Sequence, residues 1–302
     1  MEIPSNHRSG FVNIIGRPNV GKSTLMNALV GERMSIITSK PQTTRHRIKG
    51  IVSDEHFQMV FSDTPGIITD PAYKMQKAMN SFVNSTFEDA DVILLVTDIY
   101  DRYEEDDALF DKIIATLVPL KIVLNKIDQC DEDLIEEKKK WWLSIFPKAD
   151  FRPISALENT NVEGLLEAVV EQLPYGPPYY PKDQLTDKPE RFFVSEIIRE
   201  KILLLYKQEI PYSCEIIIEE YQEPKEANDE FTRIRAVIIV SRKTQKGIII
   251  GKGGQSIKKL GIEARKDIET FIQSKVYLEL FVKVKENWRN DERLLKHFGY
   301  KH

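Results

Sequence analysis

The sequence predicts two domains of different fold class, an α/β domain followed by a smaller α+β domain. Up to Leu173, short apolar runs alternate with helical patterns, which is typical of a doubly wound, mostly parallel sheet. Beyond a proline-rich stretch the order changes to helix, strand, strand, helix, helix, strand. A chain of 302 residues is long enough to form both cores.

The first domain contains five segments with strand character and three with helical character. The strands are expected in Gly10–Gly16, Phe57–Gly66, Asp91–Asp98, Leu120–Asp128 and Asp150–Ser155, and the helices in Lys22–Gly31, Asp133–Phe146 and Val162–Leu173. Ligands of such sheets bind where the strands end, so functional residues are expected directly after them.

The stretch "LPYGPPYYP" (173–181) and the polar residues up to Pro189 separate the two domains. Five prolines and a glycine within 174–189 continue neither a helix nor a central strand. We therefore predict a first domain over 1–176, a linker over 177–190 and a second domain over 191–302. In the second domain, helices are expected in 190–208 and on both sides of "GKGG", the second of them running to about Ser274. Strands are expected in 213–221, 231–241 and 276–285.

Composition and charge narrow the function classes. The sequence contains no transmembrane run, no signal-peptide pattern and no metal-type cysteine spacing, so we expect a reducing, cytoplasmic setting. The first 189 residues carry 21 Lys and Arg against 29 Asp and Glu, whereas residues 231–268 carry ten basic side chains against two acidic ones. Such a basic segment indicates either a polyanionic partner or a solvated face.

The stretch 16–23, "GRPNVGKS", matches the phosphate-loop pattern GxxxxGK[ST] between a predicted strand and helix. A match of this kind arises by chance in roughly one such chain in a hundred. Backbone amides at the start of the helix would hold phosphates, Lys22 would reach the terminal phosphates, and Ser23 would bind Mg²⁺. The expected contacts are Gly16, Asn19, Val20, Gly21, Lys22, Ser23 and Thr24.

Three further motifs follow strands in order. "DTPG" places Asp63 for Mg²⁺, with Thr64 and Pro65 beside it and the Gly66 amide facing the γ-phosphate. In "NKID", the Asp128 carboxylate would accept from the N1–H and N2 amine of guanine, which adenine lacks. Asn125 would tie this loop to the base edge, and Lys126 would cover the base. In "ISA", the amides of Ser155 and Ala156 would bind the guanine O6.

This set of motifs resembles the G1, G3, G4 and G5 boxes of translation-factor-class GTPases, and "PQTTRHR" (41–47) supplies the G2 threonine. Thr43 and Thr44 are equal candidates for Mg²⁺ from sequence, and either would make this loop a γ-phosphate switch. We expect GTP and GDP as ligands, with Lys22, Thr43, Thr44 and Gly66 serving hydrolysis.

Two residues bear on the rate of hydrolysis. Ile67 stands where many signalling GTPases carry a water-orienting glutamine, so slow intrinsic turnover is expected. Asn19 matches the asparagine that helps to place K⁺ in several relatives. We hypothesise that K⁺ stimulates hydrolysis; the alternative is that Asn19 merely braces the loop.

A second glycine-rich loop, "GKGG" (251–254), follows a different pattern. It lacks the GK[ST] spacing, and GxxG alone is common by chance, but it lies between helical segments in the most basic part of the chain. This context resembles a type II KH domain, whose GxxG loop clamps a nucleic-acid backbone. Single-stranded RNA is the expected ligand, and DNA is not expected. The expected RNA contacts are Lys243, Lys246, Ile250, Gly251, Lys252, Gly253, Gly254, Ile257, Lys258 and Lys259.

A guanine-specific GTPase domain joined to a KH domain resembles the Era family over nearly the whole chain. The resemblance implies binding to the 3′ end of small-subunit ribosomal RNA, a role in assembly of that subunit, peripheral contact with the inner membrane and a monomeric state. Two alternatives remain open: a regulatory GTPase that acts on a protein or membrane partner, and an RNA-binding protein with a vestigial nucleotide site. "WRND" (288–291) could touch RNA or seal the KH core, whereas Trp141 and Trp142 are interpreted as packing residues.

Overall fold

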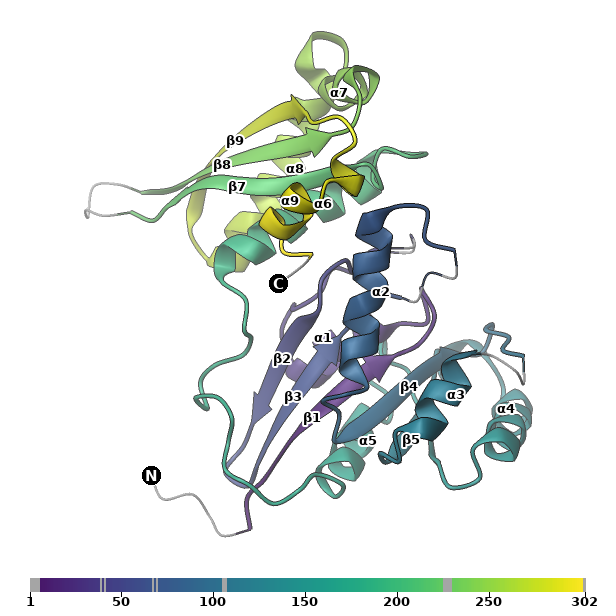
Figure 1. Cartoon of the computed structure of the whole chain (residues 1–302). Helices are drawn as coiled ribbons and strands as arrows, with labels where there is room; N and C mark the ends of the chain where they lie inside the picture. The colour runs from purple at the N-terminus through teal and green to yellow at the C-terminus, as the bar shows by residue number, and fades with distance from the viewer. Residues whose placement is uncertain are drawn as a thin grey trace. The chain divides into compact units, whose positions relative to one another are not determined.

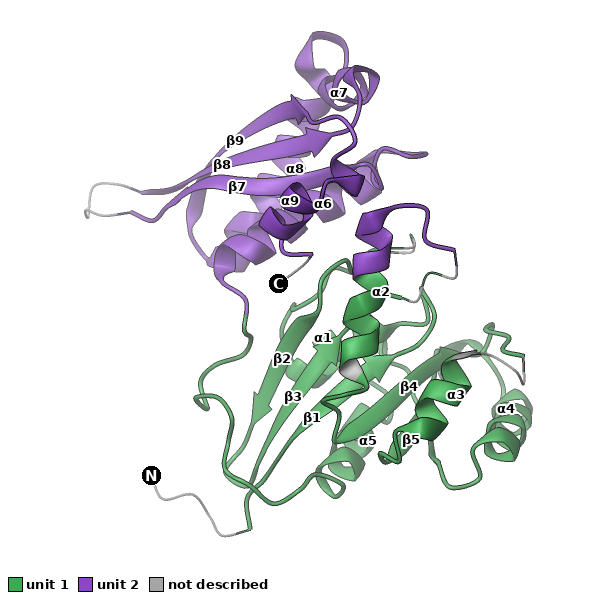
Figure 2. Ribbon diagram, in the orientation of Figure 1, with its two compact units in different colours: residues 1–69, 79–187 green, residues 70–78, 188–302 purple. Residues whose placement is uncertain are grey.

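The computed structural model describes residues 6–38, 40, 42–66, 68, 70–104, 108–224 and 230–300. These residues form two compact units, one comprising residues 1–69 and 79–187 and the other residues 70–78 and 188–302 (Figures 1 and 2). None of the helices in the described ranges has the length and hydropathy of a bilayer-spanning segment.

The first unit is built on a six-stranded sheet in the order β2-β3-β1-β4-β5-β6. Its strands are β1 (Arg8–Ile15), β2 (Ile48–Ser53), β3 (Phe57–Asp63), β4 (Val92–Asp98), β5 (Leu120–Asn125) and β6 (Asp150–Pro153). β1 pairs in parallel with β3 and β4, while β2 alone runs antiparallel, along β3. The doubly wound, mostly parallel sheet predicted from the sequence is confirmed.

Helices cover both faces of this sheet (Figure 1). They are α1 (Lys22–Val30), α2 (Lys74–Thr86), α3 (Ala108–Ala115), α4 (Glu132–Ile145) and α5 (Val162–Val170). On one face, α3 and α4 enclose an aromatic cluster in which the Trp142 ring lies 5.2 Å from that of Tyr103 and 5.7 Å from that of Phe110. Trp142 is almost fully buried, so it packs as the sequence indicated.

The proline-rich stretch after α5 passes the starts of β1 and β3 and then runs beside the edge strand β2. Its backbone bonds to β1 through Ser9 N–H and the Pro174 carbonyl, and to β2 through Ile51 N–H and the Leu185 carbonyl. Between these points the Gln58 side chain accepts from the amides of Tyr179 and Tyr180. Prolines suit this path, because only some backbone amides of an edge segment need partners.

The second unit contains a three-stranded sheet, β7-β8-β9, formed by Cys214–Gln222, Phe231–Val240 and Lys275–Val284. β8 pairs antiparallel with β7 and parallel with β9. The helices α6 (Glu190–Leu205), α7 (Lys243–Ile250) and α8 (Gln255–Ile272) complete the helix-strand-strand-helix-helix-strand order. The α+β, KH-type prediction is confirmed.

A C-terminal helix that the sequence analysis did not anticipate, α9 (Glu292–His297), follows β9. Trp288, just before it, is fully buried, and its indole N–H donates to the Ser213 carbonyl at 3.1 Å. The Tyr300 hydroxyl beyond α9 donates to the buried Glu215 carboxylate at 2.6 Å. Of the two roles considered for "WRND", Trp288 therefore has the structural one: it packs in the core of the second unit.

We expect Trp288→Ala to destabilise the second unit by about 3–5 kcal/mol, because it removes a fully buried indole and leaves the Ser213 carbonyl without its donor. Hydrogen exchange of β7 and β8 amides measures this loss. Trp141→Ala, a half-buried tryptophan of the first unit, is the matched control and should leave these amides protected. Unchanged protection in Trp288→Ala would contradict the structural role.

Candidate nucleotide and nucleic-acid sites

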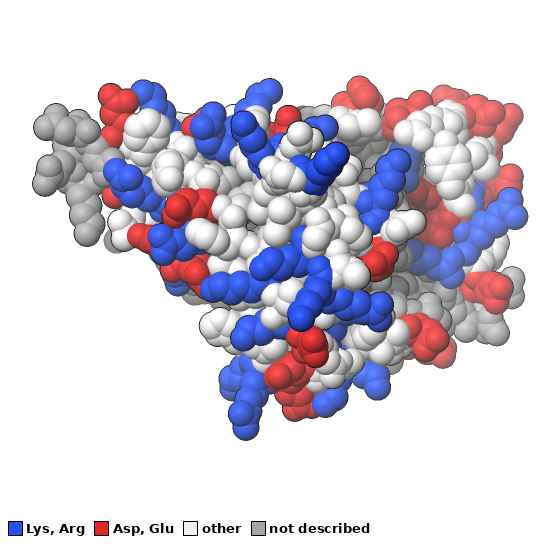
Figure 3. All heavy atoms as spheres, turned by 90° about the horizontal axis from the view of Figure 1, so that it is seen from above, with Lys and Arg blue, Asp and Glu red and all other residues white. Residues whose placement is uncertain are grey.

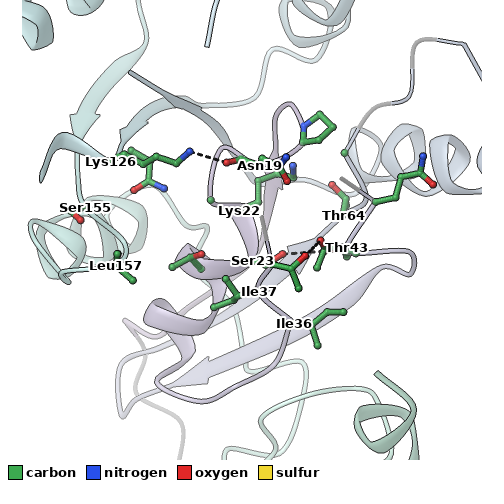
Figure 4. A pocket seen from close by; sticks show the side chains of 18 of the residues that line it. Asn19, Lys22, Ser23, Ile36, Ile37, Thr43, Thr64, Lys126, Ser155 and Leu157 are labelled. Carbon is green, nitrogen blue, oxygen red and sulfur yellow. Dashed lines mark hydrogen bonds between the residues drawn. The ribbon is translucent and has the colours of Figure 1, made fainter. Parts of the chain in front are cut away.

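The ends of β1, β3, β5 and β6 meet at one edge of the first sheet, where a cavity of about 360 Å³ opens (Figure 4). Sequence-predicted residues that line it are Asn19, Gly21, Lys22, Ser23, Thr24, Thr43, Thr44, Thr64, Gly66, Asn125, Lys126, Asp128 and Ser155. Gly16, Val20, Asp63, Pro65 and Ala156 lie in the same loops but do not line the cavity. Its volume suits a nucleotide-sized ligand.

The loop between β1 and α1 closes around the Lys22 ammonium group. Its Nζ donates to the carbonyl oxygens of Gly16 at 3.0 Å and Arg17 at 2.7 Å. Burial lowers the pKa of Lys22 to about 8, while the carboxylates of Asp63 and Asp101 oppose the shift. A desolvated cation at the start of a helix is an environment that favours an incoming anion.

Gly21 is required where α1 begins. Its φ is +98°, and a Cβ at this position would lie 2.1 Å from the Asn125 side-chain nitrogen. That amide group in turn donates to the Val20 carbonyl at 2.9 Å and accepts from the Ala156 amide at 2.9 Å. Asn125 thus joins the phosphate loop to the "ISA" loop, and it also lines the cavity.

Three oxygens converge below the phosphate loop. Ser23 Oγ donates to Asp63 Oδ2 at 2.7 Å, and Thr44 Oγ1 lies 3.0 Å from Ser23 Oγ and 3.3 Å from the same carboxylate oxygen. The other oxygen, Asp63 Oδ1, is buried and has no hydrogen-bond partner among the described residues. Burial raises the pKa of Asp63, with Lys22 opposing the rise. Hard oxygen donors with an unsatisfied carboxylate oxygen fit Mg²⁺.

The structure separates the two threonines that the sequence left as equal candidates. Thr44 is buried beside Ser23 and Asp63. The Thr43 hydroxyl instead donates to the Lys40 carbonyl at 2.6 Å and lies 2.8 Å from Thr38 Oγ1 (Figure 4). In this arrangement Thr44, and not Thr43, belongs to the oxygen cluster.

"NKID" and "ISA" occupy the opposite end of the cavity. Lys126 Nζ donates to the Asn19 carbonyl at 2.9 Å (Figure 4) and pairs with Asp98 at 2.5 Å. Asp128 is exposed, and a hydrogen bond from Ser155 keeps its pKa below the usual range, so the carboxylate is a ready acceptor. The amides of Ser155 and Ala156 are already bonded, to Thr160 O and Asn125 Oδ1.

Sequence reasoning missed several cavity residues. They are Pro18, Ile36, Ile37, Thr38, Gln42, Gln129 and Leu157. Leu157 is largely exposed at the "ISA" end, and Ile37 is about half exposed. Apolar side chains at this end of the cavity suit a flat ring, but no motif marks them. Ile67 lies outside the described residues.

In the second unit, "GKGG" forms a single tight turn between α7 and α8. Gly251, Gly253 and Gly254 have φ of +72°, +60° and +78°. A Cβ on Gly251 would lie 2.2 Å from Ser256 Oγ, whereas at Gly253 and Gly254 it would meet nothing within 4 Å. The last two glycines therefore leave an open, side-chain-free surface beside the exposed Lys252.

A shallow groove lies next to this turn, between α8 and β9. Ile257 and Lys258, both predicted RNA contacts, line it together with Gly261, Ile262, Arg265, Val276, Tyr277, Leu278 and Leu280. Tyr277 and Ile262 are about half exposed, as expected of an apolar wall open to solvent. The β9 side of the groove was not predicted, because β9 is far from "GKGG" in sequence and alternates like any strand.

The predicted basic residues lie on α7, in the turn and at the start of α8, and Lys258 lines the groove. Lys243, Lys252, Lys258 and Lys259 are exposed, and Lys246 is partly exposed on α7, while Ile250 packs partly against the core. Figure 3 shows Lys and Arg side chains gathered around uncharged surface on one face of the molecule. Positive charge around an apolar groove suits a polynucleotide better than an isolated nucleotide.

Comparison with known proteins finds relatives of both units. Residues 11–126 match the model of a family described as "50S ribosome-binding GTPase", and residues 209–289 match that of the KH domain. The chain is 44% identical over 295 residues to GTPase Era of Clostridium kluyveri, covering 97% of this chain and 99% of that protein. The chain belongs to the Era GTPase family.

Other Era proteins extend this relationship. GTPase ERA1, chloroplastic, of Zea mays is 46% identical over 299 residues, covering 98% of this chain and 71% of the maize protein. A crystal structure of an Aquifex aeolicus Era variant bound to GDP and AlF₄⁻ superposes with a TM-score of 0.92 at 36% identity, covering 98% of this chain and 100% of that chain. Like its relatives, this Era protein is a GTP hydrolase.

In this chain we expect Asp128→Asn to weaken GTP binding by about 100-fold and to create binding of xanthosine triphosphate, because the amide donates where the carboxylate accepted. Fluorescent-nucleotide titration with both nucleotides measures the exchange. Asp131→Asn, an exposed helix cap nearby, is the matched control and should leave both affinities unchanged. A parallel loss of affinity for both nucleotides in Asp128→Asn would argue against base recognition.

Proposed function

We propose that this Era protein binds the single-stranded 3′ end of small-subunit ribosomal RNA, assists assembly of the small ribosomal subunit and alternates between RNA-binding states under GTP control. The observation that carries the proposal is the basic, apolar groove beside "GKGG" in a chain that also holds a complete guanine-nucleotide cavity. A related Era structure of 37% identity and TM-score 0.92, in complex with MgGDPNP and nucleotides 1506–1542 of 16S ribosomal RNA, supports the choice of RNA.

In the proposed mechanism, the first unit binds GTP across the cavity. Gly16 to Thr24 hold the phosphates, with Lys22 on the terminal ones, and Asp128 and the "ISA" loop select guanine. Ser23 and Thr44 would hold Mg²⁺ together with Asp63, the latter through water, and the ion would neutralise negative charge on the phosphates. Gly66 lies against the phosphate loop, because a Cβ on it would be 2.7 Å from Pro18 Cγ. From there its amide can face the γ-phosphate.

In the second unit, the glycines of "GKGG" admit phosphates to the backbone amides, while unstacked bases lie against Ile257, Tyr277 and Leu280. Lys252 and the lysines of α7 and α8 add a salt-sensitive attraction. The family-model description names the large subunit, so binding to isolated small and large subunits directly tests this choice.

The variant Gly253→Asp/Gly254→Asp introduces two negative charges and should lower affinity for a single-stranded fragment of the 16S 3′ end at least 100-fold, because two carboxylates face the phosphates. GTP turnover without RNA should be unchanged. The matched control, Gly253→Asn/Gly254→Asn, tolerates the same positive φ without adding charge and should bind far better. Equal RNA affinity in the Asp variant and wild type would refute the RNA site.

A GTP-ordered switch loop would change the population that is competent to bind RNA. We expect at least a fivefold difference in RNA affinity between the GTP-analogue and GDP states, a coupling of about 1 kcal/mol. Fluorescence anisotropy of a labelled 3′-end fragment measures it, with Asp128→Asn plus the xanthine nucleotides as a nucleotide-specific control. Identical affinities in the two states would reject GTP control.

K⁺ is proposed as an activating ion that Asn19 helps to place. Asn19 has a φ of +68°, and its carbonyl accepts from Lys126, so its side chain is carried on a constrained turn at the cavity. We expect GTP turnover to be several-fold faster in KCl than in NaCl, and the difference to disappear in Asn19→Ala. Equal rates of GTP turnover in KCl and NaCl would contradict a role for K⁺.

We propose a monomer that acts in the cytoplasm, with peripheral contact at the inner face of the membrane and no DNA partner. The C. kluyveri relative is bacterial, whereas the maize relative is named as a chloroplast protein. Flotation of the purified protein with anionic lipid vesicles tests the membrane contact.

A further inference from the structure

The segment that runs from the last residue of β4, residues 98–103 ("DIYDRY"), carries none of the GTPase motifs, yet it is connected to the phosphate loop at two points, once through Lys126 and once directly. At its start, Asp98 accepts from the amides of Tyr100 and Asp101 at 2.9 and 2.8 Å, which closes a tight turn. The other Asp98 oxygen pairs with Lys126, whose Nζ also donates to the Asn19 carbonyl. Lys126 therefore makes the first connection, between Asp98 and the Asn19 carbonyl of the phosphate loop.

The second point is Arg17, directly after the first glycine of the phosphate loop. Its guanidinium lies 4.0 Å above the Tyr103 ring, pairs with Asp101 at 3.2 Å and donates to the Arg102 carbonyl. Its backbone N–H donates to the Tyr103 hydroxyl at 3.3 Å. Asp101 is mostly buried. Burial raises the pKa of its carboxyl group, and the neighbouring Arg17 guanidinium opposes this rise.

These contacts act on Lys22 through one planar peptide. The N–H that Tyr103 accepts and the Gly16 carbonyl that accepts from Lys22 belong to the same peptide bond, so fixing one side orients the other. The next carbonyl, that of Arg17, also accepts from Lys22. With two of its three N–H bonds committed to these carbonyls, the ammonium has one left, and its direction is set.

We propose that Tyr103, Asp101 and Arg17 are positioning residues for Lys22: they hold the Gly16–Arg17 peptide so that both carbonyls face the ammonium and its remaining N–H points to the terminal phosphates. The inference rests on the proposed role of Lys22 in phosphate binding. Arg17 is 38% exposed, so its ion pair adds little to stability. Its effect is on geometry, and misplacement of a phosphate-binding group by about 1 Å costs up to 100-fold.

The sharpest test is Tyr103→Phe, which removes one oxygen and leaves the ring under Arg17. We expect affinity for a GTP analogue with Mg²⁺ to fall about fivefold, and more than affinity for GDP, because Lys22 reaches the γ-phosphate. Asp101→Asn and Arg17→Ala should each cost about tenfold. Tyr175→Phe, in the same unit, is the matched control and should change affinity less than twofold, since its hydroxyl accepts from Arg8 and neither residue lines the nucleotide cavity.

A double-mutant cycle separates positioning from general support of the fold. In a Lys22→Ala background, the effect of Tyr103→Phe on GTP-analogue affinity should disappear. An undiminished effect there, or a Tyr103→Phe affinity within twofold of wild type, overturns the inference. If Lys22→Ala alone leaves GTP affinity unchanged, the proposed role of Lys22 fails, and the inference fails with it. Thermal unfolding of each nucleotide-free variant shows whether it is folded. If Arg17→Ala does not fold, the effect of Tyr103→Phe on GTP-analogue affinity still tests the inference.

Discussion

The desolvation of Lys22 and Asp63 at one edge of the first sheet is the constraint on which the nucleotide site depends. Two opposite charges that are almost fully buried are costly unless surrounding groups satisfy them. Here the carbonyls of Gly16 and Arg17 accept from the ammonium, and the hydroxyls of Ser23 and Thr44 satisfy one carboxylate oxygen. The other carboxylate oxygen is buried and has no hydrogen-bond partner among the described residues, which matches the proposed Mg²⁺ site.

In the second unit, the turn proposed to bind phosphates has its charged side chain in solvent and not in a buried site. "GKGG" is an exposed turn in which three glycines with positive φ leave backbone amides accessible, and its lysines stay in solvent. A buried cation selects a compact, highly charged triphosphate, whereas an exposed turn beside a groove suits a long, evenly charged backbone. The two glycine loops of the chain therefore differ in burial, and that difference matches their proposed ligands.

Much of the fold was predictable, because the buried strands β1, β3, β4 and β5 are apolar runs and the motifs follow them directly. β2 was missed because Ile48–Ser53 is short and mixes Lys49 and Gly50 with apolar residues. α9 was missed because a six-residue helix has almost no periodicity. The α8–β9 groove was half missed, since only the α8 side adjoins a motif.

The sequence by itself determined the class of each domain, the order of the guanine-nucleotide motifs and the family, because these depend on residue types at fixed local spacing. Only the tertiary structure decided between Thr43 and Thr44, placed Trp288 in a core, turned the Asn125 side chain toward two loops and brought Tyr103 to the phosphate loop. Each of these depends on contacts between residues far apart in the chain, and local spacing carries no information about which of two neighbouring side chains a folded sheet will bury.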